Sequence, residues 1–306
     1  MIKKSASLKE NLYVGIIQTD LDANVAWANA SKGIFEMNDY EAERSWSQIK
    51  SAFIQMREAL TVPDIIVLPE LSIPKTYVNR LRQFARSMGS IVVAGIDYET
   101  TFTPNRTVKN SAIVLIPPTL KSIGRLKGPR SHGGGAQKFV GKIYPAPLEI
   151  KVLDDAGFQF ISDNVIWLFE SASLGTFGVT ICYDLMDLER ALMYKDRIHH
   201  LFVLAYNKDI NSFYHLAEAM CRTIYCNVVI CNTGFYGGSL AVKPYNTSWE
   251  RTVYRHEGGN LNTMQIVQLP IKSLDNAQRG VLVDGFKNPP PSSKHSLKKT
   301  STAILK

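Results

Sequence analysis

The stretch GVTICYDLMDLE, residues 178–189, runs from apolar residues to a cysteine and decides how the rest of the chain is interpreted. The apolar and β-branched residues before Cys182 predict a short buried strand that ends at this cysteine. Asp184 and Asp187 follow where a helix can begin, and the positive end of such a helix would lower the pKa of the thiol. Ligands of open α/β sheets bind beyond the carboxyl ends of the strands. Cys182 is therefore a candidate nucleophile, with a buried core cysteine as the plainer alternative.

The composition is that of a folded protein, since 45% of the 306 residues are hydrophobic and 20% are charged. This length suits one large α/β domain or two small ones. We expect no membrane span, because no apolar run approaches the ~20 residues that a bilayer requires, and no signal peptide is recognised. Four cysteines are too few for a disulfide-stapled secreted domain, which predicts a cytoplasmic location. Cys221, Cys226 and Cys231 lack the paired spacing of a zinc site and are interpreted as core residues.

The net charge of +8 is concentrated in two segments. Residues 121–151 hold seven Lys or Arg side chains against one acidic residue, and residues 287–306 hold five lysines and no acid. Neither segment interleaves aromatic and basic residues as RNA-recognition surfaces do, so nucleic acid is not expected as a partner. The Pro- and Lys-rich end predicts a flexible basic tail over 286–306 that follows one domain over 1–285.

Hydrophobic periodicity predicts strand–helix–strand units in both halves of the chain. The predicted strands cover residues 12–18, 65–68, 91–96, 110–116, 138–144, 165–169, 177–182, 201–206, 227–231, 251–254 and 264–269, and the predicted helices cover 40–60, 76–88, 187–195 and 211–225. This repetition predicts two sheets with helices outside them. The glycines of GPRSHGGGAQ, in the loop between two of these strands, lack the Lys-Ser/Thr pair that a phosphate-binding P-loop requires.

Three predicted strand ends carry reactive side chains. Glu70 follows the strand IIVL, Lys142 and Glu149 lie in GKIYPAPLE, and Cys182 ends GVTIC. A carboxylate that takes a thiol proton, a thiolate that attacks and an ammonium that holds the resulting oxyanion are the parts for covalent attack on a carbonyl. From the residues alone, Glu70 is equally a helix-start carboxylate, and Lys142 a surface lysine paired with Glu149.

These motifs resemble those of the carbon–nitrogen hydrolase (nitrilase-like) superfamily over about residues 11–272. The motifs that carry the resemblance are, in chain order, Gln18 at the end of the first strand, Glu70 in LPE, Lys142 in a K-x-x-P-type segment, and Cys182 in G-x-x-I-C-Y-D with Glu189 seven residues on. The segment NTGFYGGS resembles the family's Asn-x-x-Gly…Ser segment, which makes Asn232, Gly234 and Ser239 structural or near-site residues.

The sequence departs from the family pattern in three places. The usual aromatic-Arg-Lys is here Val140-Gly141-Lys142, so Lys138 is an alternative for the family's lysine, although Pro145 and a second glutamate downstream favour Lys142. The helix segment MCRTIYCN lacks the family's Glu-Asn pair, and the Gly-rich loop before Lys142 is long.

The resemblance implies a four-layer αββα sandwich and a cysteine mechanism that needs no metal or organic cofactor. By this resemblance Glu70 is the base, Cys182 the nucleophile, and Lys142 and the backbone N–H of Tyr183 hold the oxyanion. Glu149 is expected to orient Lys142 or to support the base. The resemblance also implies a homodimer or higher homo-oligomer, formed through the helices after the cysteine strand and by C-terminal exchange.

The expected substrate is a small molecule with an amide-type C–N bond. Nitrile-cleaving relatives typically have Trp-Glu after the cysteine, whereas this chain has Tyr183 and Asp184, which favours amides. The competing interpretation is a nitrilase-like binding or regulatory module that works with a partner protein, for example in a bacterial defence or reverse-transcriptase-associated system, with little turnover.

Overall fold

The computed structural model describes residues 7–120 and 135–291, which form two facing mixed β-sheets. The first sheet has the order β13 (Thr263–Pro270), β1 (Asn11–Gln18), β2 (Ile65–Val67), β3 (Ile91–Thr101), β4 (Thr107–Ile116) and β5 (Ala136–Gly141), with β6 (Gln159–Phe160) beside β4. The second has the order β12 (Thr252–Arg255), β11 (Leu240–Val242), β10 (Asn227–Asn232), β9 (His200–Ala205), β8 (Gly175–Ile181) and β7 (Leu168–Ser171).

Helices and short turns connect these strands. The α-helices are α1 (Ala23–Ala26), α2 (Asp39–Glu58), α3 (Val78–Met88), α4 (Pro147–Asp155), α5 (Leu188–Tyr194), α6 (Ile210–Met220), α7 (Ser248–Arg251) and α8 (Lys272–Gln278). The 3₁₀ turns are η1 (Ala30–Lys32), η2 (Lys75–Tyr77) and η3 (Cys182–Met186), and a π-helical turn, η4 (Cys221–Tyr225), continues α6.

The centre of each sheet is parallel, through β1–β2–β3 in the first sheet and β8–β9–β10 in the second. Antiparallel strands extend each sheet on both sides of this centre. Because the carboxyl ends of parallel strands meet at one edge of a sheet, β2 and β8 end where a site can form.

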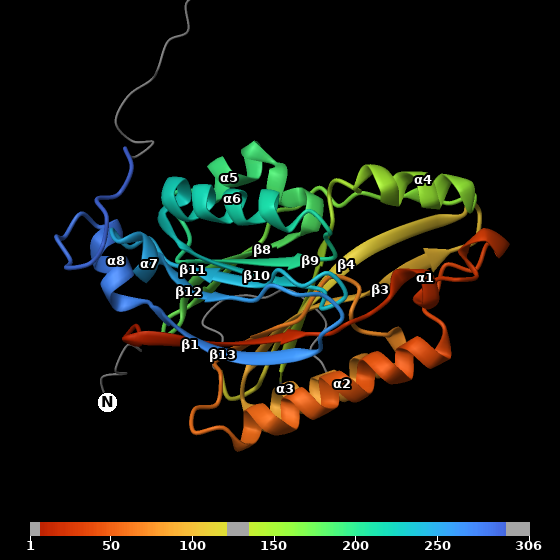
Figure 1. Cartoon of the computed structure of the whole chain (residues 1–306), viewed down its shortest axis with the longest axis horizontal. Coiled ribbons are helices and arrows are strands. Elements are labelled where there is room, and N and C mark those ends of the chain that lie inside the picture. Colours follow the sequence, from red (N-terminus) through yellow and green to blue (C-terminus); the bar gives the residue numbers. More distant parts are fainter. Residues whose placement is uncertain (1–6, 121–134, 292–306) are drawn as a thin grey trace, which may run out of the picture.

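Four layers are visible in Figure 1, with α2 and α3 covering the first sheet and α5 and α6 covering the second. One hydrophobic core fills the space between the sheets, with contributions from residues such as Val14, Val67 and Phe202. A second core lies between the first sheet and α2 and α3, around Ile49 and Phe53. The predicted four-layer αββα sandwich is confirmed.

The sequence patterns located the buried strands and long helices but missed some short elements. The helix α4 begins at Pro147 and was not predicted, because the residues around its start, PAPL at 145–148, resemble a loop. The strand β11 and the helices α7 and α8 were also missed, since each is short and lies among turn-forming residues.

Both basic segments lie partly outside the described residues. The Gly-rich loop falls at 121–134, and residues 292–306 contain most of the predicted tail. At the start of that tail Phe286 is buried against Tyr225 and Leu274. No helix in the described part of the chain is long and apolar enough to cross a membrane.

Candidate active site

The structure brings together the side chains that follow β2, β5 and β8. The Nζ atom of Lys142 lies 2.9 Å from Oε1 of Glu70 and 2.5 Å from Oε2 of Glu149. The Cys182 side chain interacts electrostatically with both Glu70 and Lys142, and its Sγ lies 4.0 Å from the carbonyl oxygen of Tyr206. The predicted carboxylates, ammonium and thiol therefore form one cluster.

Glu70 is 3% exposed, and both of its carboxylate oxygens accept hydrogen bonds. Oε1 accepts from Lys142 and from Nδ2 of Asn110 at 2.8 Å, and Oε2 accepts from the backbone N–H of Tyr206 at 3.0 Å. Burial raises the pKa of Glu70, and the Lys142 ammonium opposes this without cancelling it. A buried carboxylate with a raised pKa is suited to accept a proton.

Lys142 is 2% exposed and lies between two carboxylates. Burial alone would lower the pKa of Lys142, but the charges of Glu70 and Glu149 outweigh burial and raise the pKa above its ordinary value. The ammonium therefore stays charged. Lys138, the alternative in the same segment, places its Nζ 3.6 Å from the ring centroid of Trp167.

Glu149 lies in the first turn of α4 and accepts four hydrogen bonds. Oε2 accepts from Lys142 and from the backbone N–H of Ala146 at 3.1 Å. Oε1 accepts from Asn110 and from the Tyr98 hydroxyl, each at 2.9 Å. Burial alone would raise the pKa of Glu149, but the Lys142 ammonium and these donors lower it. Glu149 thus remains an anion beside Lys142.

Cys182 is the first residue of the turn η3 and adopts φ +47°, a left-handed conformation that is strained for a residue with a side chain. Its side chain is 7% exposed. Burial and the charge of Glu70 raise the pKa of the Cys182 thiol well above its ordinary value, although Lys142 pulls it down. The expected lowering by a helix terminus is therefore wrong, because a short 3₁₀ turn follows the cysteine and the desolvation is large.

Asp184 is fully buried and holds the chain beside Lys142. Its carboxylate accepts from the backbone N–H groups of Ile143 at 3.1 Å and Tyr144 at 2.7 Å, and it pairs with Arg190 at 3.0 Å. Asp184 thus binds backbone and Arg190, while Glu189 in the same signature is exposed.

The segment NTGFYGGS, residues 232–239, follows β10 and contacts the end of β1. Ser239 donates to Oε1 of Gln18 at 2.6 Å and accepts from the backbone N–H of Asn232 at 3.0 Å. Gly234 packs so closely that a Cβ there would lie 2.0 Å from the Leu261 carbonyl oxygen. These contacts join β1 to the end of β10, which agrees with a structural role.

Sequence reasoning missed Asn110, Tyr98 and the Tyr206 amide as neighbours of the two glutamates. Asn110 is the first residue of the predicted strand 110–116. Its polar side chain, at the start of a mostly apolar strand, was the available signal. His215, whose position in the predicted helix 211–225 left a place in the pocket open, is exposed, and the aromatic residues Phe235 and Tyr236 of NTGFYGGS are half-buried. No group of three or more His, Cys, Asp or Glu side chains in the described ranges is arranged to hold a metal ion.

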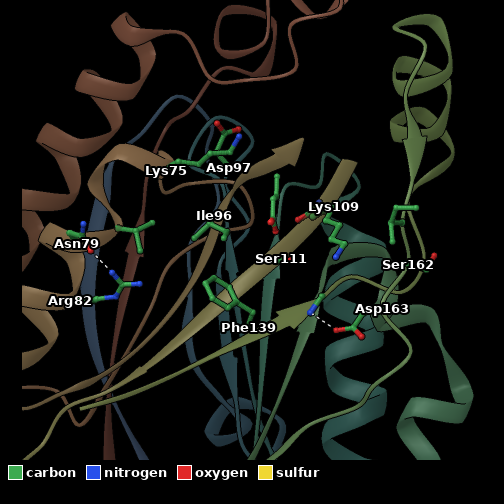
Figure 2. Close-up of a pocket in the computed structure, with 15 residues that line it drawn as sticks. Lys75, Asn79, Arg82, Ile96, Asp97, Lys109, Ser111, Phe139, Ser162 and Asp163 are labelled. Atoms are coloured by element: carbon green, nitrogen blue, oxygen red, sulfur yellow. Dashed lines mark hydrogen bonds between the residues drawn. The ribbon is translucent and has the colours of Figure 1, made fainter. Parts of the chain in front are cut away.

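A cleft of about 660 Å³ lies on the outer face of the first sheet and borders this cluster at Asn110. Figure 2 shows its floor at Ile96 and Phe139, with Arg82 on one side and Lys109 and Asp163 on the other. Glu70, Lys142 and Cys182 do not line it. Alternation along β4 explains this arrangement, because Lys109 and Ser111 face the cleft while the Asn110 side chain points to the glutamates.

The architecture is a four-layer αββα sandwich with two carboxylates, an ammonium and a thiol at adjoining strand ends. This is the fold of solved members of the nitrilase, or carbon–nitrogen hydrolase, superfamily, so the fold that the resemblance implies is confirmed. No protein-family model matches the chain. A search of curated protein sequences also finds no match.

Solved structures match nearly the whole chain at low sequence identity. Nit3 of Saccharomyces cerevisiae, a member of branch 10 of the nitrilase superfamily, is 17% identical with a TM-score of 0.61, and the match covers 92% of this chain and 98% of Nit3. An amidase from Nesterenkonia sp. is 14% identical with a TM-score of 0.57, covering 90% and 96%. A CN-hydrolase superfamily protein from Xanthomonas campestris is 11% identical with a TM-score of 0.57, covering 89% and 95%.

Proposed function

We propose that this protein is an amidase-type hydrolase that cleaves a non-peptide C–N bond of a small molecule through a cysteine thioester. The observation that carries this proposal is the contact of Glu70 with both Lys142 and Cys182 in one buried cluster. A base, a nucleophile and a fixed positive charge are the minimum set for acyl transfer.

The proposed first half-reaction forms the thioester. Glu70 takes the Cys182 proton while Sγ bonds to the amide carbon, and the electron pair of the C=O π bond moves to oxygen. Lys142 and the backbone N–H of Tyr183 hold this oxyanion. The C–N bond then breaks as the oxyanion collapses, and Glu70 returns the proton to the departing ammonia or amine.

The second half-reaction is hydrolysis. Water attacks the thioester carbon and gives a proton to Glu70, the C–S bond breaks, and the thiol regains the proton. Burial raises the pKa of Glu70, which makes this carboxylate a stronger proton acceptor, while the charge of Lys142 opposes the effect of burial on the Cys182 thiol. Glu149 keeps Lys142 oriented throughout and stays ionised, as its lowered pKa requires.

The structural neighbours support this chemistry by analogy. One structure of the Nesterenkonia sp. amidase has the acetamide moiety of fluoroacetamide covalently added at the active-site cysteine. A small uncharged amide is therefore a reasonable first substrate class for this chain. The Tyr183–Asp184 pair favours an amide over a nitrile.

The proposed assembly is a homodimer or higher homo-oligomer. Apolar side chains on α5 and just before it are unusually exposed: Met186, Leu188, Leu192 and Met193. Exposed apolar residues grouped on one helix favour a protein–protein contact. The same surface supports the second candidate, a nitrilase-like module that binds a partner protein and turns over little substrate.

Ammonia release from a panel of small amides tests the enzyme proposal. We expect turnover by the wild-type protein and none by Cys182→Ala, with both proteins folded by circular dichroism. Intact-mass measurement after rapid quenching should detect an added acyl group on the wild-type protein alone. If no amide is turned over and iodoacetamide does not alkylate Cys182 at neutral pH, the enzyme proposal fails. A partner protein that co-purifies equally with both variants would then favour the binding module.

A further inference from the structure

Asn110 touches three of the proposed catalytic groups from one position in β4. Its side chain is 1% exposed, and Nδ2 donates to Glu70 at 2.8 Å and to Glu149 at 2.9 Å. Its backbone oxygen accepts the Lys142 N–H at 2.8 Å. Within the described residues Oδ1 of Asn110 has no hydrogen-bond partner, so the amide is committed to the two carboxylates through its N–H groups.

Two carboxylates that share one ammonium repel each other, and repulsion of this kind drives a proton onto one of them. A primary amide nitrogen carries two hydrogens and no charge, so it can donate to both carboxylates at once without adding to or cancelling the charge of the cluster. A lysine or arginine here would neutralise the second carboxylate, and an aspartate would add a third negative charge.

The surroundings of the two carboxylates differ. Glu149 accepts from Tyr98, Ala146, Asn110 and Lys142, so all its hydrogen bonds stabilise the anion. Glu70 also accepts three hydrogen bonds, but of the two carboxylates Glu70 is the one that interacts with the Cys182 thiol, with which it can exchange a proton. The Asn110 amide, which donates to both carboxylates, fixes the position of Glu70 relative to Glu149.

We propose that Asn110 is a positioning residue whose amide bridges Glu70 and Glu149, fixes both carboxylates about Lys142 and so reserves proton exchange with Cys182 for Glu70 alone. This inference rests on the proposed function, because it gives Glu70 the role of base. Asn110 acts by positioning Glu70 and does not contact the substrate itself.

The test is the pH dependence of Cys182 alkylation by iodoacetamide, which needs no substrate. The reactive form appears when the Glu70–Cys182 pair loses its first proton, so the midpoint of the rate profile reports the Glu70 carboxyl. Asn110→Leu removes both donors at similar volume and should raise this midpoint by about one pH unit, because loss of a hydrogen bond to a charged group favours the protonated carboxyl. Asn110→Ser, which donates to one carboxylate at most, should give a smaller upward shift.

Ser111→Ala is the matched control, since Ser111 lies next on the same strand and lines the cleft on the opposite face. We expect its midpoint to equal that of the wild-type protein. An unchanged midpoint in folded Asn110→Leu, or an equal shift in Ser111→Ala, overturns the proposal. If Asn110→Leu does not fold, an unchanged midpoint in Asn110→Ser overturns it instead. A shifted midpoint without turnover of any amide would keep the role of Asn110 and reject the amidase function.

Discussion

Gly95 in β3 lies against the backbone that carries Glu70, and replacing it with alanine should displace that residue. A Cβ at Gly95 would lie 2.5 Å from Glu70 Cα, from Leu71 N and from Pro69 O. An ordinary contact for a Cβ begins near 3.4 Å, so the two segments must separate by about 1 Å. All three neighbours are backbone atoms, and Gly95 N donates to Pro69 O at 3.1 Å, so rotation of a side chain cannot relieve the clash.

A misplacement of about 1 Å in a catalytic group costs on the order of 100-fold in rate, which equals about 2.7 kcal/mol of activation free energy. We expect Gly95→Ala to lose this factor in Cys182 alkylation at fixed pH and in amide turnover. The unfolding free energy should fall by about 1–3 kcal/mol, as in other overpacked sites. Alkylation that is quenched at intervals and followed by intact-mass measurement gives the rate of Cys182 modification, and urea unfolding gives the free energy of unfolding.

Gly15→Ala is the matched control. Gly15 is a strand glycine of the same sheet, but a Cβ there meets Sδ and Cε of Met56, at 2.7 and 2.8 Å, which are the flexible end of a side chain. This variant should keep the wild-type alkylation rate. A folded Gly95→Ala protein whose rate is within threefold of the wild type would refute the argument from backbone contact.

Two further predictions concern buried ionisable side chains. Asp184→Asn leaves the buried Arg190 with only the more distant carboxylate of Asp187, 3.9 Å away, and removes one acceptor from the Ile143–Tyr144 backbone. We therefore expect a loss of stability of about 3 kcal/mol by urea unfolding and at least tenfold slower alkylation of Cys182. Wild-type stability together with a wild-type alkylation rate would show that Asp184 does not hold the Lys142 segment. Burial lowers the pKa of His200 from 6.5 to about 3, so this ring stays neutral when the folded protein is acidified while the unfolded chain takes up a proton below pH 6.5. Stability from His200 is therefore complete above pH 6.5 and declines as the pH falls toward 3, by about 2 kcal/mol at pH 5. His200→Gln should lack this part of the decline when urea unfolding is compared at pH 7.5 and pH 5, and equal declines in both proteins would contradict it.

The sequence was sufficient to predict the layers and the strand ends, because both follow from local patterns. The apolar runs before Glu70 and Cys182 identify buried strands, and the ends of such strands meet at one edge. Lys142 also lies where a strand ends, directly after β5. The choice between Lys142 and Lys138 needed the structure, since four residues of strand separate them by about 13 Å and place Lys138 on Trp167.

The properties that depend on contacts through space could not be predicted. Glu70, the proposed base, accepts a hydrogen bond from the backbone N–H of Tyr206, which is 136 residues away in sequence. Glu149 is held by the unpredicted helix α4 and by Asn110 from β4. The thiol pKa was predicted in the wrong direction because burial, which dominates it, is not visible in the residues that follow Cys182.

The residues of the cluster come from both sheets, so the geometry of the cluster depends on how the two sheets pack together. Glu70 and Lys142 follow strands of the first sheet, whereas Cys182 and Tyr206 follow strands of the second. Two sets of hydrogen bonds therefore connect the two sheets at this point. The Tyr206 N–H donates to Glu70, and Asp184 accepts from the backbone that follows Lys142. Neither sheet alone carries the whole cluster, so the cluster is complete only where the two sheets pack against each other.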